Sequence, residues 1–179
     1  VRYATSLIAL NKRDCDGFER MYGRKPELIF PITSPKVDLD AVPVLTAINR
    51  PFLLFVGADF YPNIEGIVWF IEHVSPFIQL DLRIVGACCN NPTLRNKTLS
   101  NVKLEGYVDD LSSYYKSALA VVAPIFKGSG MKTKVIEAMS FGKSIIGTDE
   151  AFQGIECDYC RMGGKCNTPS EFIHAINSL

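Results

Sequence analysis

Short apolar runs alternate with longer amphipathic segments along most of this chain. The run F-L-L-F-V-G at 52–57 is continuously apolar, which is typical of a parallel strand buried on both faces. Apolar residues spaced three and four apart after Asn63 predict a helix through Val74, with Asn63 as its N-cap. Further strands are expected at 80–86, 102–108, 118–125, 143–148 and about 164–167, and further helices from Asp109 and from about Thr168. This alternation predicts an α/β fold, a doubly wound parallel sheet of Rossmann-like type with helices on both faces.

The first fifty residues form a separate, smaller pattern. Residues 4–10 are typical of a short strand, residues 11–22 of a short helix closed by Gly23, and residues 27–32 of a second strand. Four prolines follow between positions 31 and 51, and they disfavour regular structure there. We therefore expect a βαβ unit plus a linker over residues 1–50 and a larger domain over residues 51–179.

The stretch K-G-S-G-M-K-T-K-V-I-E-A-M-S-F-G at 127–142 joins a predicted strand to a predicted helix. Gly128 and Gly130 permit a sharp turn that exposes backbone N–H groups where the helix starts. Lys127, Lys132 and Lys134 crowd this end, although the positive end of a helix dipole disfavours cations. A bound phosphate reconciles these features, because anions commonly occupy strand–glycine–helix junctions. The other reading is a glycine-rich turn followed by solvated lysines.

Two common phosphate motifs do not fit this stretch. A P-loop requires glycine where the chain has Phe126, and a dinucleotide fingerprint requires a third glycine where it has Thr133. In a doubly wound sheet, ligands bind beyond the carboxyl ends of the strands. The loops expected there are 58–62, 87–92, 107–110, 127–130 and 149–154. The sequence thus predicts a phosphate site of another kind on the loop 127–130.

Composition narrows the class of partner. Lysine plus arginine equals aspartate plus glutamate at 19 each, whereas proteins that bind polyanions usually have a basic excess, so nucleic acid is not the expected partner. No apolar run is long enough to span a bilayer. The chain starts at Val1 without a signal-peptide pattern, and we expect it to be a fragment of a longer protein.

Six cysteines raise the question of a metal site. The pair Cys157 and Cys160, followed by Cys166, has spacing seen in zinc and redox sites. A closed zinc site needs a fourth ligand, and His73 and His174 lie elsewhere in the sequence. No βαβ unit opens from this pair as a thioredoxin-type motif requires. We therefore expect reduced thiols and no bound metal.

Four segments, read in order, resemble the donor-binding domain of group 1 (family 4) glycosyltransferases. They are F-L-L-F-V-G-A-D-F-Y-P-N-I-E-G-I-V-W-F, L-R-I-V-G, V-K-L-E-G-Y-V-D-D-L and V-V-A-P-I-F-K-G-S-G-M-K-T-K-V-I-E-A-M-S-F-G-K-S-I-I-G-T. The resemblance runs from about residue 52 to 154 and implies the C-terminal half of a two-Rossmann-domain enzyme. The first unit, ending F-P-I-T-S-P, is similar to the last unit of the family's N-terminal domain.

The resemblance implies roles for residues of the 127–142 stretch. Glu137 matches the second glutamate of the family's Glu-x7-Glu motif, which binds the nucleotide ribose, and the first glutamate falls on Ser129. Lys132 matches a basic residue that meets the diphosphate. The other reading of Glu137 is an intrahelical pair with Lys134, worth about 0.3 kcal/mol.

Two further loops have counterparts in the family. Tyr107 and Val108 match the segment beside the nucleobase, although Tyr107 fits a core aromatic equally well. The family's frequent arginine after the first strand's glycine, Gly57, is absent here, and the lysines after Gly130 are expected to replace its charge. Lys132 and Glu137 are the expected catalytic residues. The expected substrate-binding set is Gly57, Tyr107, Val108, Gly128, Ser129, Gly130, Met131, Lys132, Lys134 and Glu137.

The activity implied by the resemblance is transfer of a hexosyl group from a nucleotide diphosphosugar to an acceptor, with retention at the anomeric carbon. This chain would supply the donor-binding half, would be inactive alone, and would need neither cofactor nor metal. The implied acceptor is a glycan or lipid-linked sugar in polysaccharide biosynthesis. The full-length protein would be cytoplasmic, with peripheral membrane association through its N-terminal domain. Two alternatives stay open, namely a sugar-nucleotide 2-epimerase of the same architecture and a non-enzymatic receiver-like binding module.

Overall fold

Six parallel strands form the central sheet of this chain, whose computed structural model describes residues 1, 3–97 and 99–179. Their order across the sheet is β5-β4-β3-β6-β7-β8. They are β5 (Val102–Gly106), β4 (Asp81–Val85), β3 (Phe52–Val56), β6 (Ala120–Ala123), β7 (Ser144–Gly147) and β8 (Gly163–Lys165). Every neighbouring pair is parallel, which confirms the predicted doubly wound sheet.

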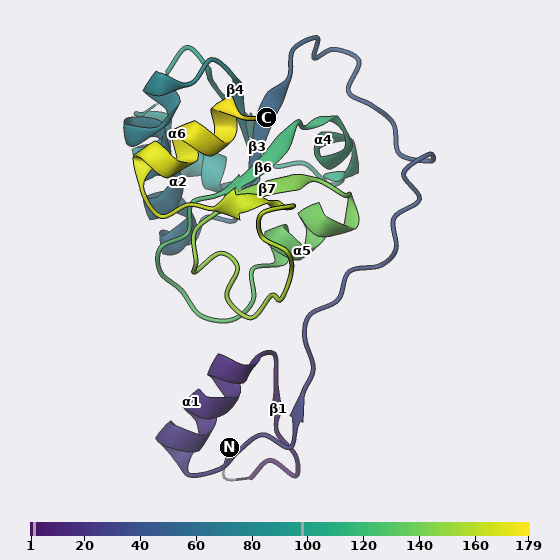
Figure 1. Cartoon of the computed structure of the whole chain (residues 1–179), viewed down its shortest axis with the longest axis vertical. Helices are drawn as coiled ribbons and strands as arrows, with labels where there is room; N and C mark the ends of the chain where they lie inside the picture. The colour runs from purple at the N-terminus through teal and green to yellow at the C-terminus, as the bar shows by residue number, and fades with distance from the viewer. Residues whose placement is uncertain (2, 98) are drawn as a thin grey trace.

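Helices cover both faces of this sheet (Figure 1). α2 (Tyr61–His73) and α6 (Pro169–Asn177) lie on one face, where the ring of Phe172 meets that of Phe70 edge-on at 5.6 Å. α4 (Ser112–Ser117) and α5 (Thr133–Ser140) lie on the other, where Tyr115 stacks on Phe141 at 5.2 Å. The short α3 (Pro92–Arg95) and two 3-10 turns (Ser75–Phe77 and Ala87–Asn90) complete the connections. Among the described residues, every helix is too short or too polar to traverse a lipid bilayer.

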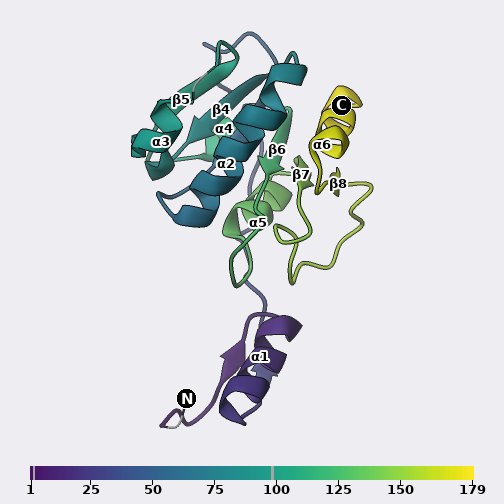
Figure 2. The ribbon, with the colours of Figure 1, turned by 90° about the vertical axis from the view of Figure 1, so that its left-hand side faces the viewer.

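A small N-terminal unit precedes the main sheet. It consists of β1 (Ile8–Ala9), α1 (Lys12–Tyr22) and β2 (Leu28–Ile29), and its two strands are parallel. As the sequence predicts, Gly23 ends α1 in a left-handed conformation, at φ 63°. Figure 2 shows this unit beyond the end of the main sheet at which α5 begins.

The linker, residues 30–51, forms neither helix nor strand but is attached to the main domain. The ammonium of Lys116 on α4 donates to the carbonyl oxygens of Leu39 and Val42, each at 2.6 Å. The backbone N–H of Leu45 donates to the hydroxyl of Ser117. These contacts fix the path of the linker along α4 and thereby help to place the N-terminal unit.

The start of α2 differs from the sequence prediction. Its N-cap is Phe60, and Asn63 lies within the first turn rather than before it. The difference arises because Pro62 fits the first turn of a helix, where no backbone N–H donor is needed. The Asn63 side chain does not cap the helix, and its amide group instead donates a hydrogen bond to the carbonyl oxygen of Ala58 at 3.0 Å.

The start of α4 also differs. This helix begins at Ser112 rather than at Asp109. The carboxylate of Asp110 accepts a hydrogen bond from the backbone N–H of Ser112 at 2.9 Å, and this local turn replaces the expected first helical turn. The other predicted elements are present, with most strands shorter than predicted and β8 starting one residue earlier. The sequence did not predict α3 or the two 3-10 turns.

Candidate functional site

The order of the main sheet reverses between β3 and β6, its two central strands. The chain leaves β3 for α2 on one face and leaves β6 for α5 on the other (Figure 1). The loops after these strands, residues 57–60 and 124–132, therefore leave the carboxyl edge of the sheet towards opposite faces, and in doubly wound sheets the ligand crevice lies between such loops. Ligands of doubly wound sheets bind at such a reversal. The loop 127–130 thus lies at the position where the fold itself favours a ligand.

The glycine loop before α5 has the backbone that its sequence requires. Gly128 and Gly130 have φ angles of 139° and 70°, which residues with a Cβ rarely adopt. Ser129 between them is exposed, whereas Met131 is buried and anchors the loop to the core. Val135, one turn into α5, is completely buried. The loop is thus fixed at both ends and presents its middle to solvent.

Two cavities separate this loop from the N-terminal unit. One, of about 570 Å³, is lined by Gly128, Ser129 and Gly130 on one side and by residues of β1 and α1 on the other. The second, of about 1030 Å³, is lined by Met131 and by Ile136 of α5, again facing residues of the N-terminal unit. A ligand bound at the loop can therefore contact both parts of the chain.

Lys132 belongs to an ion network that joins the two parts of the chain. Its ammonium lies 2.8 Å from the carboxylate of Glu150 and 2.9 Å from the carbonyl oxygen of Gly130. Arg13 of α1 donates to both oxygens of the same carboxylate, at 2.8 and 3.1 Å. Burial raises the pKa of Glu150, but the hydrogen bonds from Arg13 and Lys132 outweigh burial and lower it overall. The Glu150 carboxylate is therefore charged and is shared by two cations.

Lys134, two residues further on, points into the protein. Its ammonium donates to the Asn63 side-chain oxygen at 2.7 Å and lies 4.3 Å from the centre of the Phe55 ring. Only 9% of the residue is exposed. Burial lowers the pKa of this lysine to about 7, although the nearby Cys88 and Glu137 act to raise it. Lys134 thus places a titrating amine beneath the crevice rather than at its surface.

Glu137 is held by a partner from α4. The hydroxyl of Tyr115 donates to Glu137 Oε2 at 2.8 Å. Tyr115 is 1% exposed, and its burial together with the charge of Glu137 raises its pKa far above the ordinary value. The tyrosine is therefore a neutral donor that orients the carboxylate. The alternative intrahelical pair with Lys134 is not formed, because the Lys134 ammonium lies at Asn63.

The other predicted contact residues follow two different strands, β3 and β5. Gly57 follows β3, and a Cβ at this position would lie 2.8 Å from the Phe55 ring and 3.4 Å from the Cys88 sulfur. Tyr107 follows β5 and is 70% exposed, so the reading of Tyr107 as a core aromatic is wrong. Val108 next to it is half-buried against the core. The structure thus presents Tyr107 as a free ring at the carboxyl edge of the sheet.

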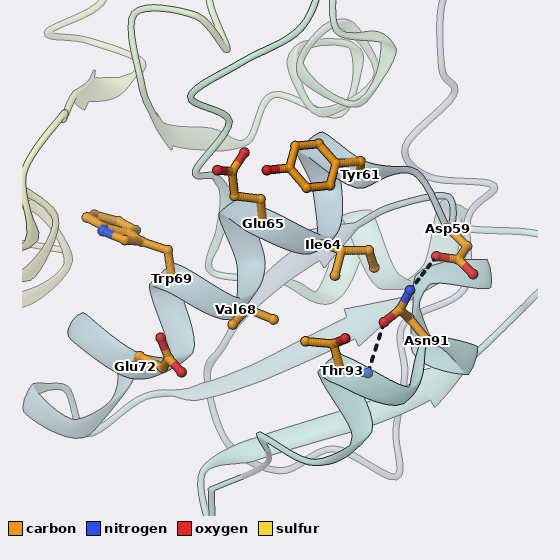
Figure 3. A pocket seen from close by; sticks show the side chains of 9 residues that line it. All are labelled: Asp59, Tyr61, Ile64, Glu65, Val68, Trp69, Glu72, Asn91 and Thr93. Carbon is orange, nitrogen blue, oxygen red and sulfur yellow. Dashed lines mark hydrogen bonds between the residues drawn. The ribbon is translucent and has the colours of Figure 1, made fainter.

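Lys127 lies apart from the other two lysines. Its ammonium pairs with Glu65 of α2 at 2.8 Å, beside the ring of Tyr61. Glu65 and Tyr61 both line a hollow of about 560 Å³ along the outer side of α2 (Figure 3). Asp59, which lines the same hollow, accepts a hydrogen bond from the amide of Asn91. The expectation that Lys127 joins the phosphate site is therefore not met in this structure.

The cysteines form no disulfide within the described part of the chain. Cys166 is buried and Cys160 is exposed. Among residues 1, 3–97 and 99–179, no three side chains of the metal-ligating types are close enough to hold an ion. The absence of a bound metal in solution stays a prediction.

Four residues of the site were not identified from the sequence. Asn63, Tyr115 and Glu150 each form a hydrogen bond with a predicted site residue. Arg13 pairs with Glu150. Glu150 does lie in a loop, 149–154, that the strand pattern placed at the carboxyl edge of the sheet. No sequence pattern identifies Arg13 as a site residue, because 137 residues separate it from its partner Glu150. The predicted residues therefore lie at one edge of the sheet, but their orientations depend on groups from other elements.

Comparison with known proteins assigns this architecture to a family. Residues 50–179 match the family model described as glycosyl transferases group 1. No curated protein sequence matches the chain significantly.

Solved structures share the fold at low sequence identity. A glycosyltransferase from Rickettsia africae has a TM-score of 0.76 at 14% identity, with 97% of this chain and 52% of that chain covered. HepE of Anabaena, in complex with UDP and glucose, has a TM-score of 0.73 at 15% identity, with 99% and 54% covered. WaaG, a glycosyltransferase involved in lipopolysaccharide biosynthesis, has 0.66 at 14%, with 96% and 54% covered. The chain spans about half the length of each. Because the family model covers most of its length, this chain belongs to the group 1 glycosyltransferases.

Proposed function

We propose that this chain is the donor-binding half of a retaining glycosyltransferase that takes a sugar from a nucleotide diphosphosugar. The observation that supports this most is the geometry at the reversal point of the sheet. A fixed glycine loop lies there, with Lys132 at the start of α5 and Glu137 further along the same helix. HepE, which shares this fold, has been solved with UDP and with UDP-glucose. These facts favour a nucleoside diphosphate as the ligand of the loop.

Each group has a chemical task in this proposal. Lys132 and the N–H groups at the start of α5 would stabilise the diphosphate as it accumulates charge on leaving the sugar. The oriented carboxylate of Glu137 would accept hydrogen bonds from the ribose hydroxyls. The exposed ring of Tyr107 would stack beside the base. Ser129, where the family's first glutamate is expected, would lie closest to the sugar and would make a weaker contact than a carboxylate.

The rest of the proposal concerns the complete enzyme. β1, β2 and the residue after them expose large apolar side chains, namely Ile8 at 60%, Leu28 at 51% and Phe30 at 60%. A two-stranded sheet with such exposure is typical of one that needs further strands. We propose that the missing partner is the acceptor-binding half, which would take a glycan or lipid-linked sugar and attach the cytoplasmic enzyme peripherally to a membrane. No cofactor is required for this chemistry.

Removing the Lys132 ammonium should weaken nucleoside-diphosphate binding. Charge-assisted contacts contribute about 1.5–3 kcal/mol, so Lys132→Ala should raise the dissociation constant for UDP or GDP roughly ten- to a hundredfold. Glu137→Gln should weaken nucleotide binding but leave inorganic pyrophosphate unaffected, because pyrophosphate has no ribose. Isothermal titration calorimetry on the purified chain measures both effects.

The matched control for these variants is Lys103→Ala. Lys103 is exposed near the opposite, amino-terminal end of β5, and its ammonium donates to the carbonyl of Ser100. The Lys103→Ala variant should therefore bind nucleotides with the same affinity as the parent chain. Equal affinity of Lys132→Ala and the parent would place the diphosphate elsewhere.

The chain alone is expected to bind a donor without transferring its sugar, because an acceptor needs the other half of the cleft. Incubation with a radiolabelled UDP-sugar and a simple glycoside acceptor should give no labelled product. Product analysis of the full-length enzyme separates a transferase from a 2-epimerase, since only the transferase consumes the acceptor. Sugar transfer by the isolated chain would contradict the proposal that this chain supplies only the donor-binding half of the active site.

A further inference from the structure

The carboxylate of Glu150 lies between two cations that come from different parts of the chain. It accepts hydrogen bonds from Lys132 of the main domain at 2.8 Å and from Arg13 of the N-terminal unit at 2.8 and 3.1 Å. Both Glu150 and Lys132 are largely buried, with side-chain exposures of 18% and 12%. A carboxylate shared in this way resembles a bound anion in charge and in hydrogen-bonding geometry.

The surroundings of this network favour an exchange of anions. Glu150 lies in the loop after β7, which ends at the same sheet edge as the glycine loop. The ammonium of Lys132 also contacts the carbonyl oxygen of Gly130, so it stays beside the glycine loop whichever anion it binds. Arg13 presents two N–H groups, and this fork fits a phosphate as well as a carboxylate. A diphosphate at the loop must therefore compete with Glu150 for the same two cations.

We propose that Glu150 is a positioning residue that holds Arg13 and Lys132 in place until the donor diphosphate displaces it. This inference rests on the proposed function, because it takes the diphosphate to bind at the glycine loop. In the ligand-free chain, the negative charge of Glu150 offsets one of the two positive charges of Arg13 and Lys132. Its hydrogen bonds to both also link the N-terminal unit to the main domain. On binding, the diphosphate takes over both hydrogen-bonding partners and bridges the two parts of the enzyme. Donor binding thereby replaces one interdomain link with another.

The test is binding of inorganic pyrophosphate and of UDP to the 1–179 chain and its Glu150→Gln variant. Glutamine keeps the shape and one hydrogen-bond acceptor but removes the competing charge. The variant should bind both ligands about tenfold more tightly than the parent, and its affinity should fall more steeply with salt. Arg13→Gln should bind both about tenfold more weakly, although Arg13 lies outside the main domain. Circular dichroism and thermal unfolding establish that each variant is folded.

The matched control is Glu65→Gln. Glu65 also pairs with a lysine of the glycine loop, Lys127, but on the outer side of α2. This variant should bind pyrophosphate like the parent. If the parent binds UDP and Glu150→Gln binds it equally or more weakly, the role of Glu150 is overturned while the proposed function stands. If neither chain binds UDP or pyrophosphate, the proposed function fails, and the inference fails with it.

Discussion

Replacement of Lys134 by methionine should make the ligand-free chain more stable at neutral pH, with a rise in melting temperature of about 6–12 °C. Lys134 is a buried amine whose pKa is lowered by burial to about 7. Burying it in the charged form costs free energy, and methionine fills the same space without a charge. The exposed Lys103, replaced in the same way, should leave the melting temperature almost unchanged.

The pH dependence of this effect has a definite sign. A lysine titrates near 10.5 in the unfolded chain and near 7 in the folded one, so between these values the unfolded chain binds more protons. The destabilising contribution of Lys134 is therefore negligible above pH 10.5 and grows as the pH decreases towards 7. The penalty is about 4 kcal/mol at pH 7 and about 1 kcal/mol at pH 10. Loss of the hydrogen bond to Asn63 offsets about 1 kcal/mol of the gain.

The same substitution should impair ligand binding. Lys134 lies beneath the crevice, beside Phe55 at the end of β3 and the Asn63 side chain in α2. A diphosphate above it would favour the ammonium form, so binding should be accompanied by proton uptake near pH 7. Thermal unfolding from pH 6.5 to 10 and calorimetry in buffers of different ionisation enthalpy measure the two effects. A melting temperature difference that stays constant with pH would show that the Lys134 amine does not titrate as its burial requires.

The fold was predictable because its signals are local. Strands buried on both faces give continuous apolar runs, and β3 is buried along its first four residues. The predicted ends were less accurate, since they depend on single residues. β6 stops at Ala123, one residue before Pro124, which has no N–H to donate to a neighbouring strand. α2 starts before Asn63 because Pro62 fits its first turn.

The site was predictable only in outline. Lys132 and Lys134 look equivalent in sequence, yet residues two apart at a helix start point in different directions. Lys132 faces Glu150 at the cleft, whereas Lys134 enters the core towards Asn63. No spacing rule predicts these contacts, because the partners come from other elements. Glycines and charges thus indicated the candidate site, and tertiary packing decided which lysine meets Glu150 and which enters the core.

Gly66→Ala should lower the free energy of unfolding by about 3 kcal/mol and the melting temperature by about 6–12 °C. Gly66 is a buried residue of α2, and a Cβ there would overlap the carbonyl oxygen of Pro124, the first residue after β6. Helix propensity alone would favour alanine by about 1 kcal/mol. The overlap is with backbone, which cannot rotate away, so α2 or the loop after β6 must shift, and the steric cost exceeds the propensity gain.

A matched substitution separates these two opposing effects. Gly17 lies in α1, where the nearest atom to an added Cβ is the flexible end of Met21 at 3.9 Å. Gly17→Ala should therefore be neutral or slightly stabilising in urea unfolding, because only the propensity gain of up to about 1 kcal/mol applies. Since the loop after Pro124 leads to Lys132, any Gly66→Ala chain that stays folded should also bind pyrophosphate more weakly. An unfolding midpoint for Gly66→Ala at or above that of the parent would show that α2 does not pack this closely on the end of β6, and the geometry of the crevice would have to be revised.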